Sequence, residues 1–194
     1  MFLVQSNQQN WQSYPVRQNE NIPAGTGKKN YVILYPAIFG GVAAFVTGFG
    51  FYGCGDHRLS GRTLALVDIY ALIAALGTGF YILNLLGDDD EKIRDFEHLK
   101  KELLSISLPI FITIFFFGSV FNLVYSLDRQ SFEGTIGKKK ITQYLSFLAL
   151  SIGDISVGDS LGISPARTGT QVLLAVESIF TLFALSLLIS LFTK

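Results

Sequence analysis

Two carboxylates and two glycines lie close together in one short, small and polar segment of the chain. The segment reads Ser151-Ile152-Gly153-Asp154-Ile155-Ser156-Val157-Gly158-Asp159-Ser160. Backbone carbonyls and carboxylate rings are the groups that attract cations and replace their water in membrane pores. Asp, Gly and Ser also dominate ordinary turns, so turn chemistry is the alternative reading of Asp154 and Asp159. Because apolar sequence flanks the segment on both sides, we expect it to line an ion pathway.

Two further acids lie inside long apolar stretches. Glu177 is the only charged residue of Val172–Phe192. An acid within a membrane span faces protein or water and is functional by default, so we expect Glu177 to support the polar segment by hydrogen bonding. An acid at the membrane surface is the alternative. Asp68 has the same two readings, either as a partner of Arg62 or another helix or as an acid at headgroup level.

The composition indicates the elements that must position these residues. Hydrophobic residues make up 49% and charged residues 15% of the 194 residues, against about 25% charged in a soluble domain. Four stretches carry at most one charge each and are long enough to cross a bilayer, namely Tyr31–Cys54, Thr63–Leu86, Leu103–Leu127 and Val172–Phe192. We therefore predict an all-α polytopic membrane protein with four transmembrane helices.

A fifth, shorter apolar run precedes the polar segment. Residues Ile141–Leu150 are too few to span a bilayer but enough for a re-entrant helix. The sequence thus predicts a re-entrant pore helix and loop between the third and fourth spans. The predicted organisation is a polar tail (1–30), two transmembrane helices plus an amphipathic linker (31–102) and a helix–pore loop–helix unit (103–194).

Two local patterns refine this organisation. Residues 92–104 place apolar side chains near one helical face, which predicts an interfacial helix, with a solvated linker as the alternative. Small residues recur at four-residue spacing in the first two spans, at Gly40, Ala44 and Gly48 and at Ala71, Ala75 and Gly79. Such faces let helix backbones approach, so we expect these two spans to pack on each other or on a neighbouring subunit.

Other function classes lack support in the sequence. The net charge is zero, which gives no basic field for nucleic acid. Cys54 and His57 have a metal-ligand spacing without a second pair, so no metal site is expected. No set of residues with the arrangement of a nucleophile and its base is visible. We expect neither an enzyme nor a cofactor.

Four short motifs resemble the pore region of the tetrameric potassium-channel superfamily, in particular its bacterial two-helix ion-channel domain. The motifs are similar to its pore helix, its filter, its post-filter turn and the start of its pore-lining helix. In that order they are Tyr144-Leu145-Ser146-Phe147, Ser151-Ile152-Gly153-Asp154, Ser164-Pro165-Ala166-Arg167 and Leu174-Ala175-Val176-Glu177.

The resemblance implies a homotetramer in the lipid bilayer that passes monovalent cations and has a cytoplasmic N-terminus. The implied ion pathway comprises Ser151, Ile152, Gly153, Asp154, Ser156, Gly158 and Asp159, with Glu177 and Tyr144 as pore support. Ile155 stands where the family has its second filter glycine. We therefore expect a weakly selective pore rather than a potassium-specific one.

The sequence leaves two functions open. The first is the pore-forming subunit of an oligomeric cation channel. The alternative is a small structural integral-membrane subunit of a larger complex, in which the pore-like loop is non-conducting and serves in packing.

Overall fold

The computed structural model of the protein describes residues 31–52, 59–87, 96–153 and 162–193. Four long helices dominate it: α1 (Tyr35–Gly50), α2 (Gly61–Gly87), α3 (Phe96–Leu127) and α5 (Thr168–Thr193). A 3₁₀ turn, η1 (Tyr31–Leu34), leads into α1. Between α3 and α5 lie the 3₁₀ turn η2 (Arg129–Ser131), strand β1 (Phe132–Glu133), the short helix α4 (Lys140–Gly153) and strand β2 (Ser164–Pro165).

The four predicted apolar stretches are confirmed as helices long and apolar enough to cross a membrane. The candidate spans are Tyr31–Gly50, Gly61–Leu86, Leu103–Leu127 and Thr168–Ser190. Apolar sequence of this length forms helix in a bilayer because every backbone polar group is then satisfied within the segment. The chain is accordingly a multi-pass membrane protein by the length and composition of its helices.

Helix α3 extends further toward the N-terminus than its apolar span. It begins at Phe96 and continues through Pro109, so the part of the expected amphipathic linker that the structure describes is continuous with the third span. The Thr113 hydroxyl donates to the Pro109 carbonyl at 3.0 Å within this helix. Residues 88–95 of the expected linker lie outside the described residues.

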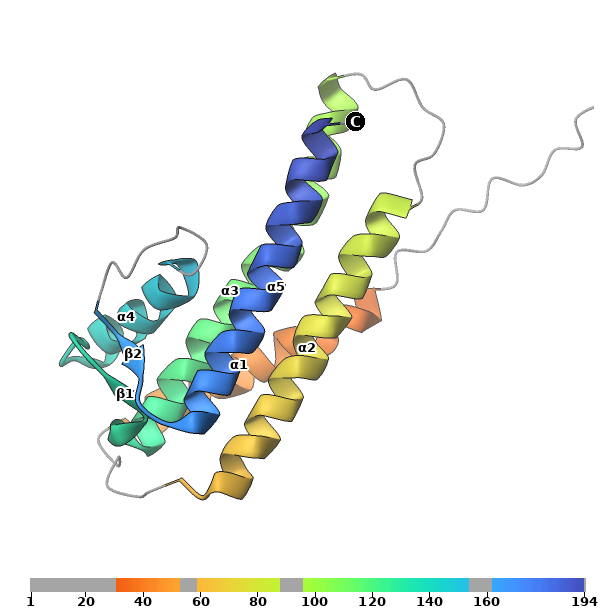
Figure 1. Cartoon of the computed structure of the whole chain (residues 1–194). Helices are drawn as coiled ribbons and strands as arrows, with labels where there is room; N and C mark the ends of the chain where they lie inside the picture. The colour runs from red at the N-terminus through yellow and green to blue at the C-terminus, as the bar shows by residue number, and fades with distance from the viewer. Residues whose placement is uncertain (1–30, 53–58, 88–95, 154–161, 194) are drawn as a thin grey trace, which may run out of the picture.

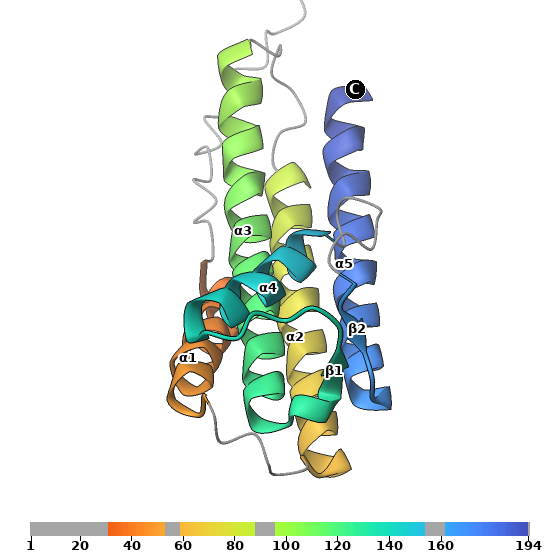
Figure 2. The ribbon, with the colours of Figure 1, turned by 90° about the vertical axis from the view of Figure 1, so that its left-hand side faces the viewer.

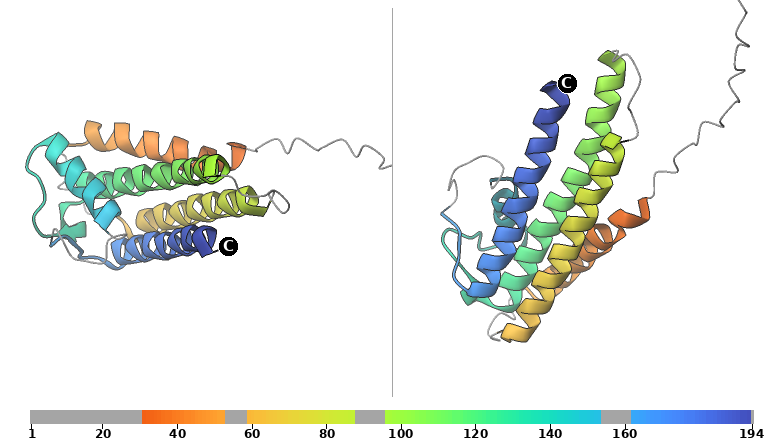
Figure 3. Two further views of the ribbon diagram at one scale, coloured as in Figure 1. Left: turned by 90° about the horizontal axis from the view of Figure 1, so that it is seen from above. Right: turned by 45° about the vertical axis from the view of Figure 1, so that its right-hand side comes forward.

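The four long helices form a row in the order α1, α3, α2, α5 (Figures 2 and 3). Helix α4 lies across one face of this row, beside the half of α3 that leads to Leu127 (Figure 1). Strands β1 and β2 pair antiparallel, with Phe132 opposite Pro165 and Glu133 opposite Ser164. This small sheet joins the end of α3 to the start of α5.

The two small-residue faces meet as expected at Gly40, where an added Cβ would contact Tyr70 of α2, but they pack mainly on other helices. On α1 the buried small residues are Ala37, Gly41, Ala44 and Gly48, and they face α3. A Cβ added at Gly41 would lie 3.2 Å from the Phe116 Cα, so the two backbones approach closely there. The Gly79 face of α2 meets Phe183 of α5. The physical reason is shape: smooth Gly/Ala faces accept the bulky aromatic side chains of α3 and α5.

Aromatic side chains fill the space between α3, α4 and β1. Phe117, Phe121, Phe132 and Phe147 are all buried. Phe132 of β1 lies with its ring centroid 5.5 Å from that of Phe121 and 5.1 Å from that of Phe147. Edge-on ring pairs at such distances add to the energy of burial. This cluster anchors α4 to the row.

Candidate functional site

Helix α4 begins beside the end of α1. The Lys140 ammonium donates to the Phe49 carbonyl at 3.3 Å and lies 5.4 Å from the centroid of the Tyr52 ring. The Thr142 hydroxyl accepts a hydrogen bond from the Lys139 N–H at 3.0 Å, which satisfies a donor at the start of the helix. The exposed lysines lie at the end of the row where α1 and α3 finish.

A buried polar network joins the first turn of α4 to α3. The Gln143 side-chain amide donates to the Asn122 Oδ1 at 2.8 Å and to the Ser126 hydroxyl at 2.9 Å. All three side chains are buried. Buried polar groups require partners, so this network favours one register of α4 against α3.

The middle of α4 packs on α1 through aromatic rings and on α3 through a close approach of the two backbones. The Tyr144 ring lies edge-on to Phe45 of α1, with centroids 5.0 Å apart. On the neighbouring face, Gly118 of α3 lets the α4 backbone come close, since an added Cβ would lie 3.1 Å from the Leu148 Cα. Tyr144 is therefore packed against α1 in this structure, while Leu148 meets α3.

The last turn of α4 contacts both α3 and α5 through one side chain. The Ser151 hydroxyl lies 3.1 Å from the Ile114 carbonyl of α3 and is hydrogen-bonded to the Glu177 carboxyl of α5. Ser151 is fully buried, and Glu177 is 2% exposed. Ser151 of α4 thus contacts both α3 and α5 in apolar surroundings.

These contacts define the path of α4. Its first turn meets Ser126, next to the end of α3, whereas its last turn meets Ile114, twelve positions earlier in α3. At 1.5 Å per residue these two levels are roughly 18 Å apart along α3. Helix α4 therefore runs from the end of the row to its middle, from α1 towards α5 (Figure 2).

A cavity of about 110 Å³ lies beside Glu177, between α3 and α5. Its lining is apolar apart from Glu177 and two threonines, Thr113 and Thr181. Cations bind where several oxygens replace their water. The apolar lining offers few such oxygens, so the cavity itself is poorly suited to a cation.

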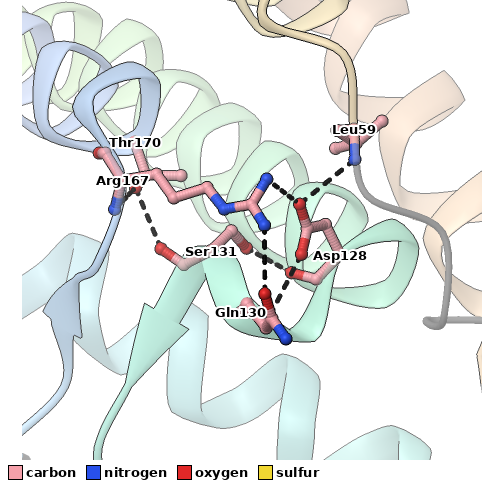
Figure 4. Close-up of polar contacts among 6 residues, drawn as sticks. All are labelled: Leu59, Asp128, Gln130, Ser131, Arg167 and Thr170. Atoms are coloured by element: carbon pink, nitrogen blue, oxygen red, sulfur yellow. Dashed lines mark hydrogen bonds and ion pairs between the residues drawn. The ribbon is translucent and has the colours of Figure 1, made fainter.

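A polar clasp (Asp128, Gln130, Ser131, Arg167 and Thr170) joins the end of α3 to the start of α5 (Figure 4). The Asp128 carboxylate lies 2.5 Å from the Arg167 guanidinium and also accepts the N–H groups of Leu59 and Gln130, both at 3.1 Å. Its side chain is 3% exposed, against 20% for Arg167. Asp128 thus has the cation and the hydrogen-bond donors that a buried carboxylate requires.

The same clasp determines where the chain returns after residues 154–161. The Ser131 carbonyl accepts the Ala166 N–H and the Thr170 hydroxyl, both at 2.9 Å. Nearby, Gly134 has φ +120°, and a Cβ there would lie 1.8 Å from the Gly162 carbonyl oxygen. Only glycine fits this close approach.

The structure brings together some of the residues singled out from the sequence. Ser151 and Glu177 are in contact, Ile152 is 49% exposed, and Gly153 is the last residue of α4. The remaining ion-pathway residues lie outside the described residues, namely Asp154, Ser156, Gly158 and Asp159. The structure therefore describes the first three residues of the expected pathway, at the end of α4. The segment with both carboxylates lies outside the described residues.

Several polar residues of the site were missed by sequence reasoning. Asn122 and Ser126 are four residues apart on α3, and Asp128 follows the last charge-free position of that helix. Polar residues at i and i+4 in an apolar helix share one face, which is the signal that could have identified them. Within the described ranges, Asp68 and Arg62 form no ion pair.

Comparisons with protein-family models, with curated proteins and with solved structures found no match to this chain.

Proposed function

We propose that this chain is the pore-forming subunit of an oligomeric cation channel, with α4 as its re-entrant helix. The observation that carries the proposal is the position of Ser151. It lies at the end of a 14-residue helix, in the middle of an apolar row, and is bonded to the buried Glu177. A short helix that stops there places its carboxyl end in the middle of the row of long helices.

The position of the carboxyl end of α4 supports a cation pathway. Within a bilayer, backbone that leaves helical structure is tolerated only where protein buries it or water reaches it. The carboxyl end of a helix also carries partial negative charge, which favours a cation. Residues that follow α4 are therefore suited to a cation pathway, with the Asp154 and Asp159 carboxylates near its mouth.

An assembly of several copies is part of the same proposal. One chain contributes one α4 and one following segment, which cannot enclose a pathway alone. Several copies around an axis would supply a ring of carbonyl and carboxylate oxygens, as cation filters require. We propose a homotetramer that passes monovalent cations, with Glu177 and Ser151 as positioning residues.

A structural subunit of a larger membrane complex is the second candidate. The observation that favours it is the set of polar contacts along α4. Gln143 and Ser151 both bond to other helices of the same chain, as the contacts of a packing element would.

A flux assay tests the channel proposal. The purified full chain, reconstituted into liposomes, is expected to release a potassium or sodium gradient. Asp154→Asn and Gly153→Ala are expected to change the flux, whereas Glu133→Gln, an exposed acid of β1, serves as the matched control. Flux that is absent, or that is unaltered by both substitutions, would reject the assignment. A single copy among different subunits in native mass spectra would favour the structural role.

A further inference from the structure

Three consecutive lysines form a basic surface where α4 begins, the lysine patch (Lys138, Lys139 and Lys140). All three residues are exposed. Within the part of the chain that the structure describes, none of them forms an ion pair with a carboxylate. Neighbouring ammonium groups repel one another, so an anion that approaches this patch is attracted by several cations at once.

The lysine patch lies beside the end of the first candidate span. The Tyr52 hydroxyl donates to the Lys138 carbonyl, and the Lys140 ammonium donates to the Phe49 carbonyl at 3.3 Å. Phe49 and Tyr52 lie on either side of Gly50, where that span ends. Lipid headgroups begin where an apolar span ends, so the lysines lie at headgroup level.

The contact between α4 and α3 gives the same level. Gln143, in the first turn of α4, donates to the Ser126 hydroxyl at 2.9 Å. Ser126 precedes Leu127, the last residue of the third candidate span. Two spans therefore end beside the first turn of α4. Lysine is well suited to this depth because its apolar stem can lie along the protein while its ammonium stays among the headgroups.

An exposed apolar face leads from the lysine patch along α4. Ile141 is 65% exposed and Leu145 is 51% exposed. Residues four positions apart lie on the same side of a helix. Because α4 runs from the end of the row to its middle, this face continues from headgroup level into the layer of the spans (Figure 2). An acyl chain can follow it while its headgroup stays at the lysines.

We propose that the lysine patch binds the headgroup of an anionic phospholipid. The headgroup phosphate lies against Lys138 and Lys139, while Lys140 stays bonded to the end of α1. One acyl chain lies along Ile141 and Leu145. The assignment rests on complementarity of charge and depth: cations without carboxylate partners among the described residues at headgroup level, and an exposed apolar face directly beyond them.

The charge of the headgroup is the specific part of this proposal. A zwitterionic lipid has the same phosphate but carries its own cation, so it gains little from the patch. A lysine near an anionic lipid surface contributes about 1 kcal/mol of attraction. Binding of the lipid does not depend on conduction, so a chain without ion flux can still bind it.

Native mass spectrometry of the full chain in detergent tests the proposal with two lipids that share acyl chains. Dioleoyl phosphatidylglycerol is expected to bind roughly thirtyfold more tightly than dioleoyl phosphatidylcholine, the ratio that about 2 kcal/mol from two lysines gives. Replacing both residues, Lys138→Gln with Lys139→Gln, is expected to bring the ratio close to one. Both positions are exposed, so the fold is retained.

A matched control removes the same number of charges from the same end of the row. Arg62 lies in the first turn of α2 and Arg129 in η2, and both are exposed. Arg62→Gln with Arg129→Gln is expected to leave the preference within about twofold of the unmodified chain, because salt screens charges that do not touch the lipid. Glycerol phosphate, which has the charge without acyl chains, is not expected to displace the bound lipid.

Three outcomes would overturn the proposal. Equal affinity for the two lipids in the unmodified chain would exclude recognition of the headgroup charge. Equal losses in the lysine and arginine double variants would assign the preference to the charge of the whole end of the row instead of the patch. Displacement by glycerol phosphate would make the patch a site for a soluble phosphate compound.

Discussion

Asp128 at the end of α3 and Arg167 before the start of α5 form an ion pair of 2.5 Å in which the acid is almost completely buried. The pair joins two helices that also line a common cavity beside Glu177, while α2 packs against both of them (Figure 3). Because Arg167 closely follows β2, the ion pair holds the chain between β2 and α5 against the end of α3.

Removing the cation of this pair is expected to destabilise the protein. Arg167→Gln leaves the buried Asp128 carboxylate with two backbone donors and no counter-charge, so we expect the free energy of unfolding to fall by about 2 kcal/mol. Thermal unfolding in detergent measures the change. Arg129→Gln, at an exposed arginine of η2, is the control and is expected to lie within about 0.5 kcal/mol of the unmodified chain. Equal effects of the two substitutions would contradict the role of the pair.

Loss of the buried Gln143 amide is expected to loosen α4 from α3. Gln143→Leu leaves the Asn122 carbonyl oxygen without its donor, which costs about 1–3 kcal/mol. Gln171→Leu changes the same residue type at an exposed position of α5 and is expected to have little effect. Hydrogen exchange of the α4 amides reports the loosening directly, and unchanged protection in Gln143→Leu would refute it.

Glu177 is expected to act through its hydrogen bond to Ser151 rather than through volume alone. Glu177→Gln keeps the side-chain shape and a group that can bond the Ser151 hydroxyl, so most of the stability is retained. Glu177→Leu keeps bulk but removes the bond and is expected to lower stability by about 1–3 kcal/mol. Chemical denaturation measures the free energy of unfolding of both variants. Comparable losses of stability in Glu177→Gln and Glu177→Leu would point to packing instead.

Two glycines are expected to respond to alanine with opposite signs. A Cβ at Gly118 meets the Leu148 backbone at 3.1 Å, so Gly118→Ala must push α4 from α3 and should cost about 1–3 kcal/mol. At Gly50, the last residue of α1, nothing lies within 4 Å of an added Cβ. Gly50→Ala should stabilise by up to about 1 kcal/mol, because alanine loses less backbone entropy. Melting temperatures that shift in the same direction would contradict this assignment of contacts.

The helices could be predicted from the sequence, and their partners could not. Charge-free runs of about twenty residues indicate spans regardless of neighbours. The Ala44 and Gly48 face of α1 is visible as a small-residue repeat, but a repeat does not say which helix it meets. The structure pairs it mainly with α3, whose Phe115 and Phe116 lie against Gly41.

The candidate site was only partly predictable for a similar reason. Ser151 and Glu177 stand out because polar residues are rare in apolar helices. Asn122, Ser126 and Gln143 have roles that depend on the crossing of α3 and α4, which no periodicity within one helix encodes. Side chains that satisfy one another across helices become recognisable only when the helices are placed.

The bond between Ser151 and Glu177 also sets an order of events during synthesis. Glu177 follows Ser151 by twenty-six positions, and it lies in α5, which is synthesised after α4. The α1–α3 contact through small residues and the Gln143 network are complete in sequence before α5 exists. Helix α4 can therefore dock on α3 at once, while Ser151 lacks its Glu177 partner until α5 inserts. Helix α5 therefore completes the polar contact in the middle of the row.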